Sequence, residues 1–143
     1  LYGPANMTMR GATVTMNVYD PHGHLVDYRR VEELAGQAHI SLRTGCFCNP
    51  GAGETAEDLG EEEMRLGIAQ AGDEINLLRF SQALQARSGK SAGAVRVSTG
   101  IASNFADIAR FLAFVAGFKD QTSLAIGSVS FDIESCRVVR DGG

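Results

Sequence analysis

The 143-residue chain lacks any apolar run of the roughly 18 residues that a membrane-spanning helix needs. It begins Leu1-Tyr2-Gly3-Pro4, with no charged segment followed by an apolar stretch, and so does not resemble a secretory signal peptide. It begins as though cut from a longer protein. The formal net charge of −4 leaves no basic excess for non-specific nucleic-acid binding. We therefore expect a cytoplasmic chain with neither a membrane segment nor a nucleic-acid partner.

Cysteine and lysine are also scarce, with only Cys46, Cys48 and Cys136 among the thiols and only Lys90 and Lys119 among the amines. An odd number of cysteines does not favour a pure disulfide framework. A domain near 150 residues buries roughly 68–70% of its unfolded surface, so its core needs neither disulfides nor a metal. The three histidines form no ligand pattern of the kind that structural zinc requires. We expect no metal site.

The rest of the chain alternates strand and helix patterns. Strands are predicted where apolar and polar residues alternate, and helices where apolar residues recur every three or four positions. Asp27 and Asn104 are suited to cap helices, and Asp107 lies where a capping box would place an acid. The pattern favours an α+β fold, with a small, mostly antiparallel or mixed sheet covered by helices on one face. The expected strands are 10–19, 39–43, 94–99, 123–131 and 136–140, and the expected helices are 27–37, 55–71, 73–87 and 104–116.

Residues 44–54 are rich in glycine and include a proline, which predicts a loop. Cys46 and Cys48 stand two residues apart in this loop, close to Arg43. A thiol in an exposed loop beside a guanidinium is a candidate nucleophile, because positive charge favours the thiolate. Three other interpretations stay open: half of a metal site, a redox pair whose disulfide would be strained, and an inert surface loop.

The segment 41–51, Ser-Leu-Arg-Thr-Gly-Cys-Phe-Cys-Asn-Pro-Gly, resembles the cysteine loop of the molybdenum-cofactor sulfurases. These belong to the class V aminotransferase and cysteine desulfurase group of pyridoxal phosphate (PLP) enzymes. Residues 95–98 with 104–108 resemble the arginine-bearing strand and the following helix of that group. The resemblance covers roughly residues 1–118 and implies the C-terminal small domain of a fold-type I PLP enzyme. Residues 119–143 would then be a C-terminal extension that packs on the same domain.

The resemblance also implies roles for individual residues. Cys48 matches the cysteine that accepts sulfur from the substrate and becomes a persulfide, whereas Cys46 stands at a variable position and is a weaker candidate. Arg43 and Arg96 match arginines at the substrate, and a guanidinium suits bidentate binding of a carboxylate. Arg96 also alternates with Val95 and Val97, so it is predicted to point away from the core. Thr44 and Asn104 are weaker candidates.

The sequence departs from the pattern of these enzymes in two respects. Sulfurases of this type usually carry a further cysteine where this chain has Gly53. The lysine that forms the Schiff base is also missing, because Lys90 lies in a Gly/Ser-rich connector and Lys119 follows the end of a helix. Both lysines are predicted to be solvated surface residues. The resemblance therefore implies PLP in the full-length protein, with none bound to this chain alone and no activity of this chain alone.

Two functions follow as hypotheses. In the first, the chain is the C-terminal part of a PLP-dependent, cysteine desulfurase-like enzyme that supplies the acceptor cysteine and the carboxylate-binding arginines. Its partners would be the large PLP-binding domain of the same protein and a sulfur acceptor, with a second subunit left open. In the alternative, the chain is a non-catalytic sulfur carrier or partner-docking domain. In either case an isolated small domain exposes the apolar face that meets its partner.

Overall fold

The computed structural model describes residues 1–45, 50–71, 77–126, 129–132 and 137–140. These residues form two compact units, one made of residues 1–44 and 94–143 and the other of residues 45–93. In the described residues, no helix is long and apolar enough to cross a membrane. The predicted boundary at residue 118 stays a prediction.

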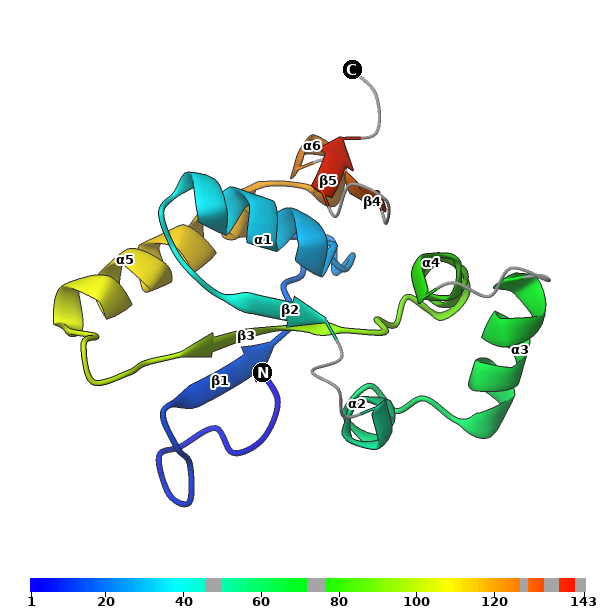
Figure 1. The fold of residues 1–143 in the computed structure, drawn as a ribbon, viewed down its shortest axis with the longest axis horizontal. Helices are drawn as coiled ribbons and strands as arrows, with labels where there is room; N and C mark the ends of the chain where they lie inside the picture. Colours follow the sequence, from blue (N-terminus) through cyan, green and yellow to red (C-terminus); the bar gives the residue numbers. More distant parts are fainter. Residues whose placement is uncertain (46–49, 72–76, 127–128, 133–136, 141–143) are drawn as a thin grey trace. The chain divides into compact units, whose positions relative to one another are not determined.

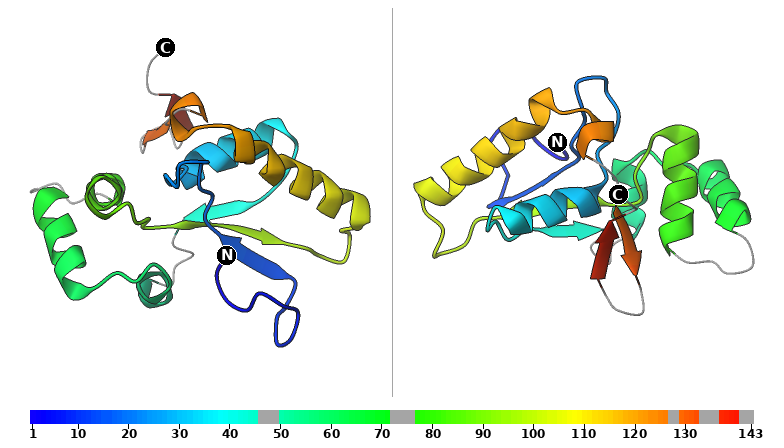
Figure 2. Two further views of the ribbon diagram at one scale, coloured as in Figure 1. Left: turned by 180° about the vertical axis from the view of Figure 1, so that it is seen from behind. Right: turned by 90° about the horizontal axis from the view of Figure 1, so that it is seen from above.

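The first unit is built on a three-stranded sheet in the order β1-β3-β2. Strand β1 (Thr13–Met16) runs antiparallel to β3 (Ala94–Ser98), with Met16 opposite Val95. Strand β2 (Arg43–Gly45) borders β3 on its other side. Helices α1 (Tyr28–Gln37) and α5 (Phe105–Ala116) lie over one face of this sheet (Figures 1 and 2). The predicted α+β class is confirmed.

The core of the first unit lies between the sheet and its helices. Helix α1 begins where the Asp27 carboxylate accepts a hydrogen bond from the Arg29 N–H, as a cap should. Val31 and Ala35, one turn apart on this helix, are both buried. Burying a side chain such as valine contributes about 1.5–3 kcal/mol. The buried residues of this cluster are Val18, Val26, Val31, Val95, Phe118 and Ile126.

Helix α5 begins at the predicted capping box. The Asn104 side chain accepts from the N–H groups of Ala106 and Asp107, and the Asp107 carboxylate accepts from the Asn104 N–H at 2.9 Å. After α5 come the 3-10 helix η1 (Gly117–Asp120) and helix α6 (Ser123–Ile126). Strands β4 (Val129–Asp132) and β5 (Arg137–Arg140) then pair antiparallel with each other.

The second unit is helical. It contains α2 (Pro50–Ala56), α3 (Glu61–Ala71) and α4 (Leu77–Ser88), and α3 packs against α4. At this contact Gly67 of α3 lies against the ring of Phe80 of α4. An ideal Cβ on Gly67 would stand only 2.7 Å from a ring carbon, so the approach needs a residue without a side chain.

Three predictions in the first half of the chain are wrong at their boundaries. The strand expected over 39–43 lies at β2 instead, because His39 has a φ of 56° and turns the chain. The loop expected over 44–54 gives way to α2 at Pro50, a position where proline suits the first turn of a helix. The helix expected over 55–71 is interrupted, because Asp58 has a φ of 53° and α3 begins only at Glu61.

The remaining differences concern strand lengths and burial. The first strand is shorter than the predicted 10–19 and the strand over 123–131 is wrong in its first half, where α6 lies. The strand predicted over 136–140 is confirmed over Arg137–Arg140. The apolar residues Ala56, Ile68 and Ala69 of the predicted helix over 55–71 would face the core in such a helix, but all three are exposed. Helices α2 and α3 therefore leave exposed some apolar side chains that the sequence pattern would place in a core.

Candidate functional site

The predicted site has its centre in the cysteine loop. Cys46 and Cys48 lie outside the described residues, as does Cys136. The structure therefore describes the elements that precede and follow the loop in sequence. These are β2, which ends at Gly45, and α2, which begins at Pro50. Gly45 has a φ of 105°, a conformation that L side chains rarely adopt, so the chain enters the loop through a backbone that favours glycine.

Two candidate residues stand on β2 at the entrance to the loop. Arg43 is exposed. Thr44 is half-buried, and its hydroxyl donates a hydrogen bond of 2.5 Å to the carboxylate of Glu32 on α1. This bond ties the end of β2 to the helix that covers the sheet. Thr44 thus has a positioning contact that its place in the motif did not reveal.

Arg96 occupies the middle of β3, directly opposite Thr15 of β1. Its neighbour Val95 is buried in the core, and successive side chains of a strand point to opposite faces. Arg96 therefore lies on the face of the sheet away from α1, as the alternation predicted. Its side chain is half-buried and has interactions of its own within the chain.

The sheet brings Arg43 and Arg96 onto neighbouring strands, β2 and β3. The sequence separates them by 53 positions, so only the strand order reveals this relation. Asn104 stands in the turn after β3, and its side-chain oxygen is already engaged in capping α5. That contact accounts for asparagine at this position without a ligand.

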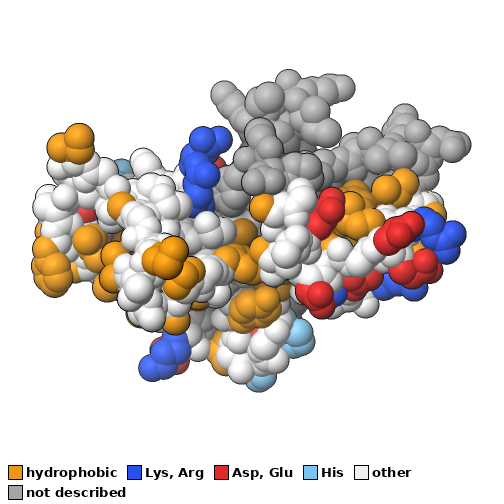
Figure 3. Space-filling view, turned by 90° about the horizontal axis from the view of Figure 1, so that it is seen from below, with side chains coloured by type: hydrophobic (Ala, Val, Ile, Leu, Met, Phe, Trp, Pro, Cys, Tyr) orange, Lys and Arg blue, Asp and Glu red, His pale blue; other side chains and the backbone are white. Residues whose placement is uncertain are grey.

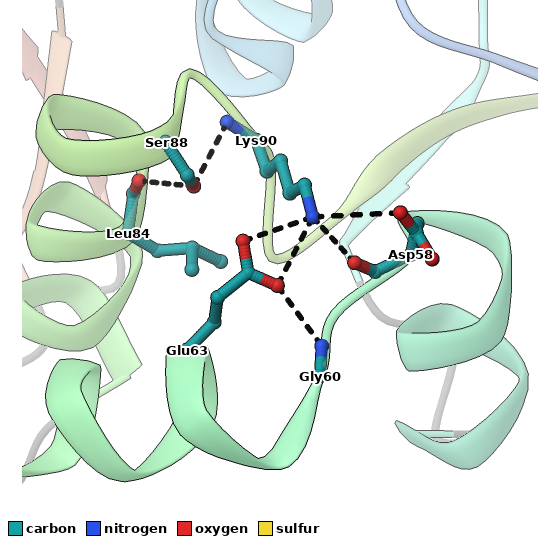
Figure 4. A network of polar contacts seen from close by, with 6 residues as sticks. All are labelled: Asp58, Gly60, Glu63, Leu84, Ser88 and Lys90. Atoms are coloured by element: carbon teal, nitrogen blue, oxygen red, sulfur yellow. Dashed lines mark hydrogen bonds and ion pairs between the residues drawn. The ribbon is translucent and has the colours of Figure 1, made fainter.

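Lys90 is the residue that the sequence described least well. Its ammonium group donates to the backbone oxygen of Asp58 at 2.5 Å and to the carboxylate of Glu63, with Nζ to Oε1 and Oε2 distances of 2.9 and 3.0 Å (Figure 4). Asp58 contributes a longer ion pair of 3.8 Å. The Lys90 side chain keeps 29% of its exposure. Lys90 thus lies at the surface, as predicted, but is half-buried and held in an ion pair that the prediction did not include.

The electrostatics of this cluster follow from its contacts. The hydrogen bond from the Gly60 N–H and then the Lys90 ammonium lower the pKa of the Glu63 carboxyl. The same carboxylate raises the pKa of Lys90, with Asp58 adding a smaller effect. Glu63 is half-buried, whereas Glu61 and Glu62, in the same turn of α3, are exposed. Acidic and basic side chains gather over α3 at the right of Figure 3.

These contacts bear on whether Lys90 could hold PLP. The cofactor needs an uncharged amine to form its covalent link. The carboxylates of Glu63 and, to a smaller extent, Asp58 raise the pKa of Lys90 and so favour its charged form, and Lys119 is exposed on η1. Among the described residues there is also no group of three or more His, Cys, Asp or Glu side chains that could hold a metal ion.

The chain is similar to a segment of molybdenum cofactor sulfurases from plants and animals. It is 39% identical to the Arabidopsis thaliana sulfurase over 123 residues, which are 80% of this chain and 14% of the relative. It is 43% identical to the Solanum lycopersicum sulfurase over 120 residues, 80% of this chain and 13% of the relative. With the Homo sapiens sulfurase the identity is 32% over 110 residues, 75% of this chain and 11% of the relative.

No family model matches the chain, and no solved structure matches it either. The chain spans about one seventh of the length of the first two sulfurases. The similarity nevertheless extends over four fifths of this chain, well beyond the eleven residues of the cysteine loop. The predicted relationship to these sulfurases is confirmed, and the chain is homologous to one segment of the molybdenum cofactor sulfurases.

Proposed function

We propose that this chain is the segment of a longer, sulfurase-like protein that receives sulfur on Cys48. The observation that carries the proposal is the similarity to molybdenum cofactor sulfurases over 80% of the chain, which includes the cysteine loop. A sulfurase has to pass a sulfur atom to its product, and a loop thiolate is the side chain suited to receive it. The elements before and after the loop support this role, since a strand anchored to α1 precedes it and a helix follows it.

The two arginines have a separate task in this proposal. Their planar guanidinium groups would bind the carboxylate of an amino-acid substrate and so orient its sulfur toward Cys48. Arg43 and Arg96 stand on neighbouring strands of one sheet, which supports a shared task. Transfer forms a bond between the Cys48 sulfur and the substrate's sulfur, and breaks the bond between that sulfur and the substrate's carbon. The electron pair of the broken bond stays with that carbon, which takes up a proton.

PLP is part of the proposal only for the full-length protein. It would supply the electron-accepting group for this chemistry from the large PLP-binding domain. No residue of this chain is assigned to it, because Lys90 is held by carboxylates. The large domain and a downstream sulfur acceptor are the proposed partners.

The test uses the full-length protein with cysteine as substrate and PLP present. Tandem mass spectrometry of the tryptic peptide 44–65 after alkylation, which separates Cys46 from Cys48 by fragmentation, is expected to find one extra sulfur atom on Cys48. Cys48→Ala is expected to abolish sulfur transfer. Cys46→Ala, two positions away in the same loop, is the matched control and keeps the persulfide. Arg96→Lys keeps the charge but loses the planar fork, and is expected to raise KM for cysteine more than it lowers kcat.

Two results would contradict the proposal: sulfur found on Cys46 alone, or full activity in the Cys48→Ala protein. The carrier alternative gives a different pattern. In that case the chain accepts sulfur on Cys48 from a separate desulfurase, and the native gene product has no large PLP-binding domain attached. The sequence that precedes Leu1 in the gene distinguishes the two.

A further inference from the structure

Glu32 makes a hydrogen bond that joins helix α1 to the strand leading into the cysteine loop. Its carboxylate accepts from the Thr44 hydroxyl at 2.5 Å, across 12 positions of sequence. The neighbouring Glu33 instead bonds to Arg30 and Gln37 of its own helix. A hydrogen bond to a carboxylate is stronger than one between two neutral groups. Glu32 therefore holds the Thr44 side chain toward α1.

This bond determines which face of the sheet each side chain of β2 occupies. Because α1 lies over one face of the sheet (Figure 1), the Thr44 side chain points to that face. Successive side chains of a strand alternate between faces, so the Arg43 side chain points to the opposite one. Arg96 lies on that opposite face too, since its neighbour Val95 is buried in the core. The two guanidinium groups thus share one face of two neighbouring strands.

The face that carries the two arginines is polar. Thr15 stands directly opposite Arg96 on the neighbouring strand. Two positions further along, Thr13 stands opposite Ser98, with their hydroxyl oxygens 3.0 Å apart. Side chains directly opposite each other on paired strands lie on the same face. A face of hydroxyl and guanidinium groups suits a carboxylate, which a guanidinium binds through two hydrogen bonds.

In strand β2, the Thr44 side chain distinguishes one face from the other. The strand has three residues, of which Arg43 is exposed and Gly45 has no side chain. A shift of one residue would reverse every side chain of the strand and turn Arg43 toward α1. We propose that Glu32 is a positioning residue for the substrate's carboxylate, which acts through Thr44 to keep Arg43 on the face that carries Arg96. The inference rests on the proposed function, which gives both arginines to that carboxylate.

The test is modification of arginine by phenylglyoxal in the full-length protein with PLP present. Serine and ethanolamine are the probes, because serine has the carboxylate of cysteine without its sulfur and ethanolamine lacks the carboxylate as well. Peptide mass spectrometry measures the modification rates of Arg43 and Arg96 separately. Serine at about four times its Kd is expected to slow both rates about fivefold in the wild type, since about four fifths of the sites are then occupied. Ethanolamine is expected to slow neither.

Variants of Glu32 separate the two arginines. With serine at the same multiple of each variant's Kd, Glu32→Ala is expected to lose the protection of Arg43 and keep that of Arg96, because it releases β2 and leaves β3 in place. Glu32→Gln keeps an oxygen that accepts from Thr44, and is expected to retain the protection of both arginines. Glu61→Ala removes an exposed glutamate of α3 and is the matched control.

Steady-state kinetics shows whether Glu32 acts through Thr44. Glu32→Ala is expected to raise KM for cysteine about fivefold, the factor for one hydrogen bond of ordinary net strength, with kcat nearly unchanged. Adding Thr44→Val to this variant should raise KM no further, because two residues that act as a unit are not additive. A further rise would overturn the proposed route through Thr44.

The remaining outcomes separate this inference from the proposed function. Protection of both arginines in Glu32→Ala, or of neither, would overturn the inference alone, because Glu32 would then not act on Arg43 in particular. Protection of Arg96 alone in the wild type would also overturn it. Protection of neither arginine in the wild type, or equal protection by ethanolamine, would refute the carboxylate-binding task in the proposed function and the inference with it. The persulfide on Cys48 is scored separately.

Discussion

At the scale of single residues, Lys90 shows how one side chain joins distant parts of the chain. Its ammonium group binds the carboxylate of Glu63 at the start of α3 and the backbone oxygen of Asp58 in the preceding turn. Lys90 itself stands in the connector after α4, 27 positions from Glu63. The ion pair therefore closes a loop of chain that contains α3 and α4. It joins the start of α3 to the connector that follows α4.

Replacing Lys90 by glutamine should lower the urea midpoint of unfolding at neutral pH, because Glu63 loses its cationic partner. The pKa of Glu63 is lowered, so its contribution is present above its ordinary value of 4.5 and is lost as the pH falls through the folded-state pKa. The pKa of Lys90 is raised, so its contribution is present below 10.5 and is lost as the pH rises through the folded-state pKa. The difference between wild type and variant should thus be largest between these limits.

Urea unfolding monitored by circular dichroism across this pH range measures that difference. Lys119→Gln is the matched control, since Lys119 is exposed and the same charge is removed. A Lys90→Gln midpoint equal to that of Lys119→Gln at every pH would show that the ion pair does not stabilise the unit.

Single residues also show what short-range patterns reveal. The capping roles of Asp27 and Asn104 were predictable, because a cap binds backbone groups two or three positions away. The outward direction of Arg96 followed from strand alternation in the same way. The partners of Thr44 and Lys90 were not predictable, because Glu32 and Glu63 come near them only through the fold.

At the scale of elements, the contact between α3 and α4 depends on a missing side chain. Gly67 is buried, and the ring of Phe80 occupies the space that a Cβ would need. A glycine inside a helix ordinarily costs stability relative to alanine, because it loses more conformational freedom on folding. Here the close approach of the two helices offsets that cost.

Gly67→Ala should therefore destabilise the second unit by about 1–3 kcal/mol, because the new methyl group pushes against a ring that cannot shift freely. The matched variant is Gly36→Ala near the end of α1, where nothing lies within 4 Å of the new Cβ. That change should be neutral or stabilise by up to about 1 kcal/mol. Thermal unfolding of both variants measures these changes in stability. A stabilising Gly67→Ala would refute the close packing of Gly67 against Phe80.

Element boundaries were predictable wherever a local signal was strong. Helices α1 and α5 begin at their predicted caps, whereas β2, α2 and the start of α3 differ from prediction. Two of these differences come from His39 and Asp58, which adopt positive φ values without being glycine. Such conformations are uncommon for residues other than glycine, although Asp and His adopt them more often than most. Local composition does not signal them.

At the scale of the whole first unit, helix α6 contributes to the core through Ile126. Ile126 of α6 is buried together with Val31 and Phe118. Its backbone oxygen accepts a hydrogen bond of 2.7 Å from the Arg30 side chain on α1. Residues nearly one hundred positions apart thus meet at the same helix. Helix α6 therefore completes the core of the first unit.

Ile126→Ala should destabilise the first unit by about 2–5 kcal/mol, the range for deleting a buried branched side chain. The matched control is Ile101→Ala, the same substitution at a fully exposed position, which should stay within about 0.5 kcal/mol of wild type. Chemical denaturation of the two variants measures both values. Equal effects would mean that Ile126 is not part of the core.

The sequence by itself determined the fold class, the two well-capped helices and the kinship with molybdenum cofactor sulfurases. Caps, alternation and the cysteine loop are patterns among neighbouring residues, and short-range physical rules govern them. Only the tertiary structure decided that Ile126 closes the core, that Lys90 pairs with Glu63 and that Thr44 bonds to Glu32. Burial and ion pairing depend on which distant segments meet, and that is settled by the packing of the whole unit.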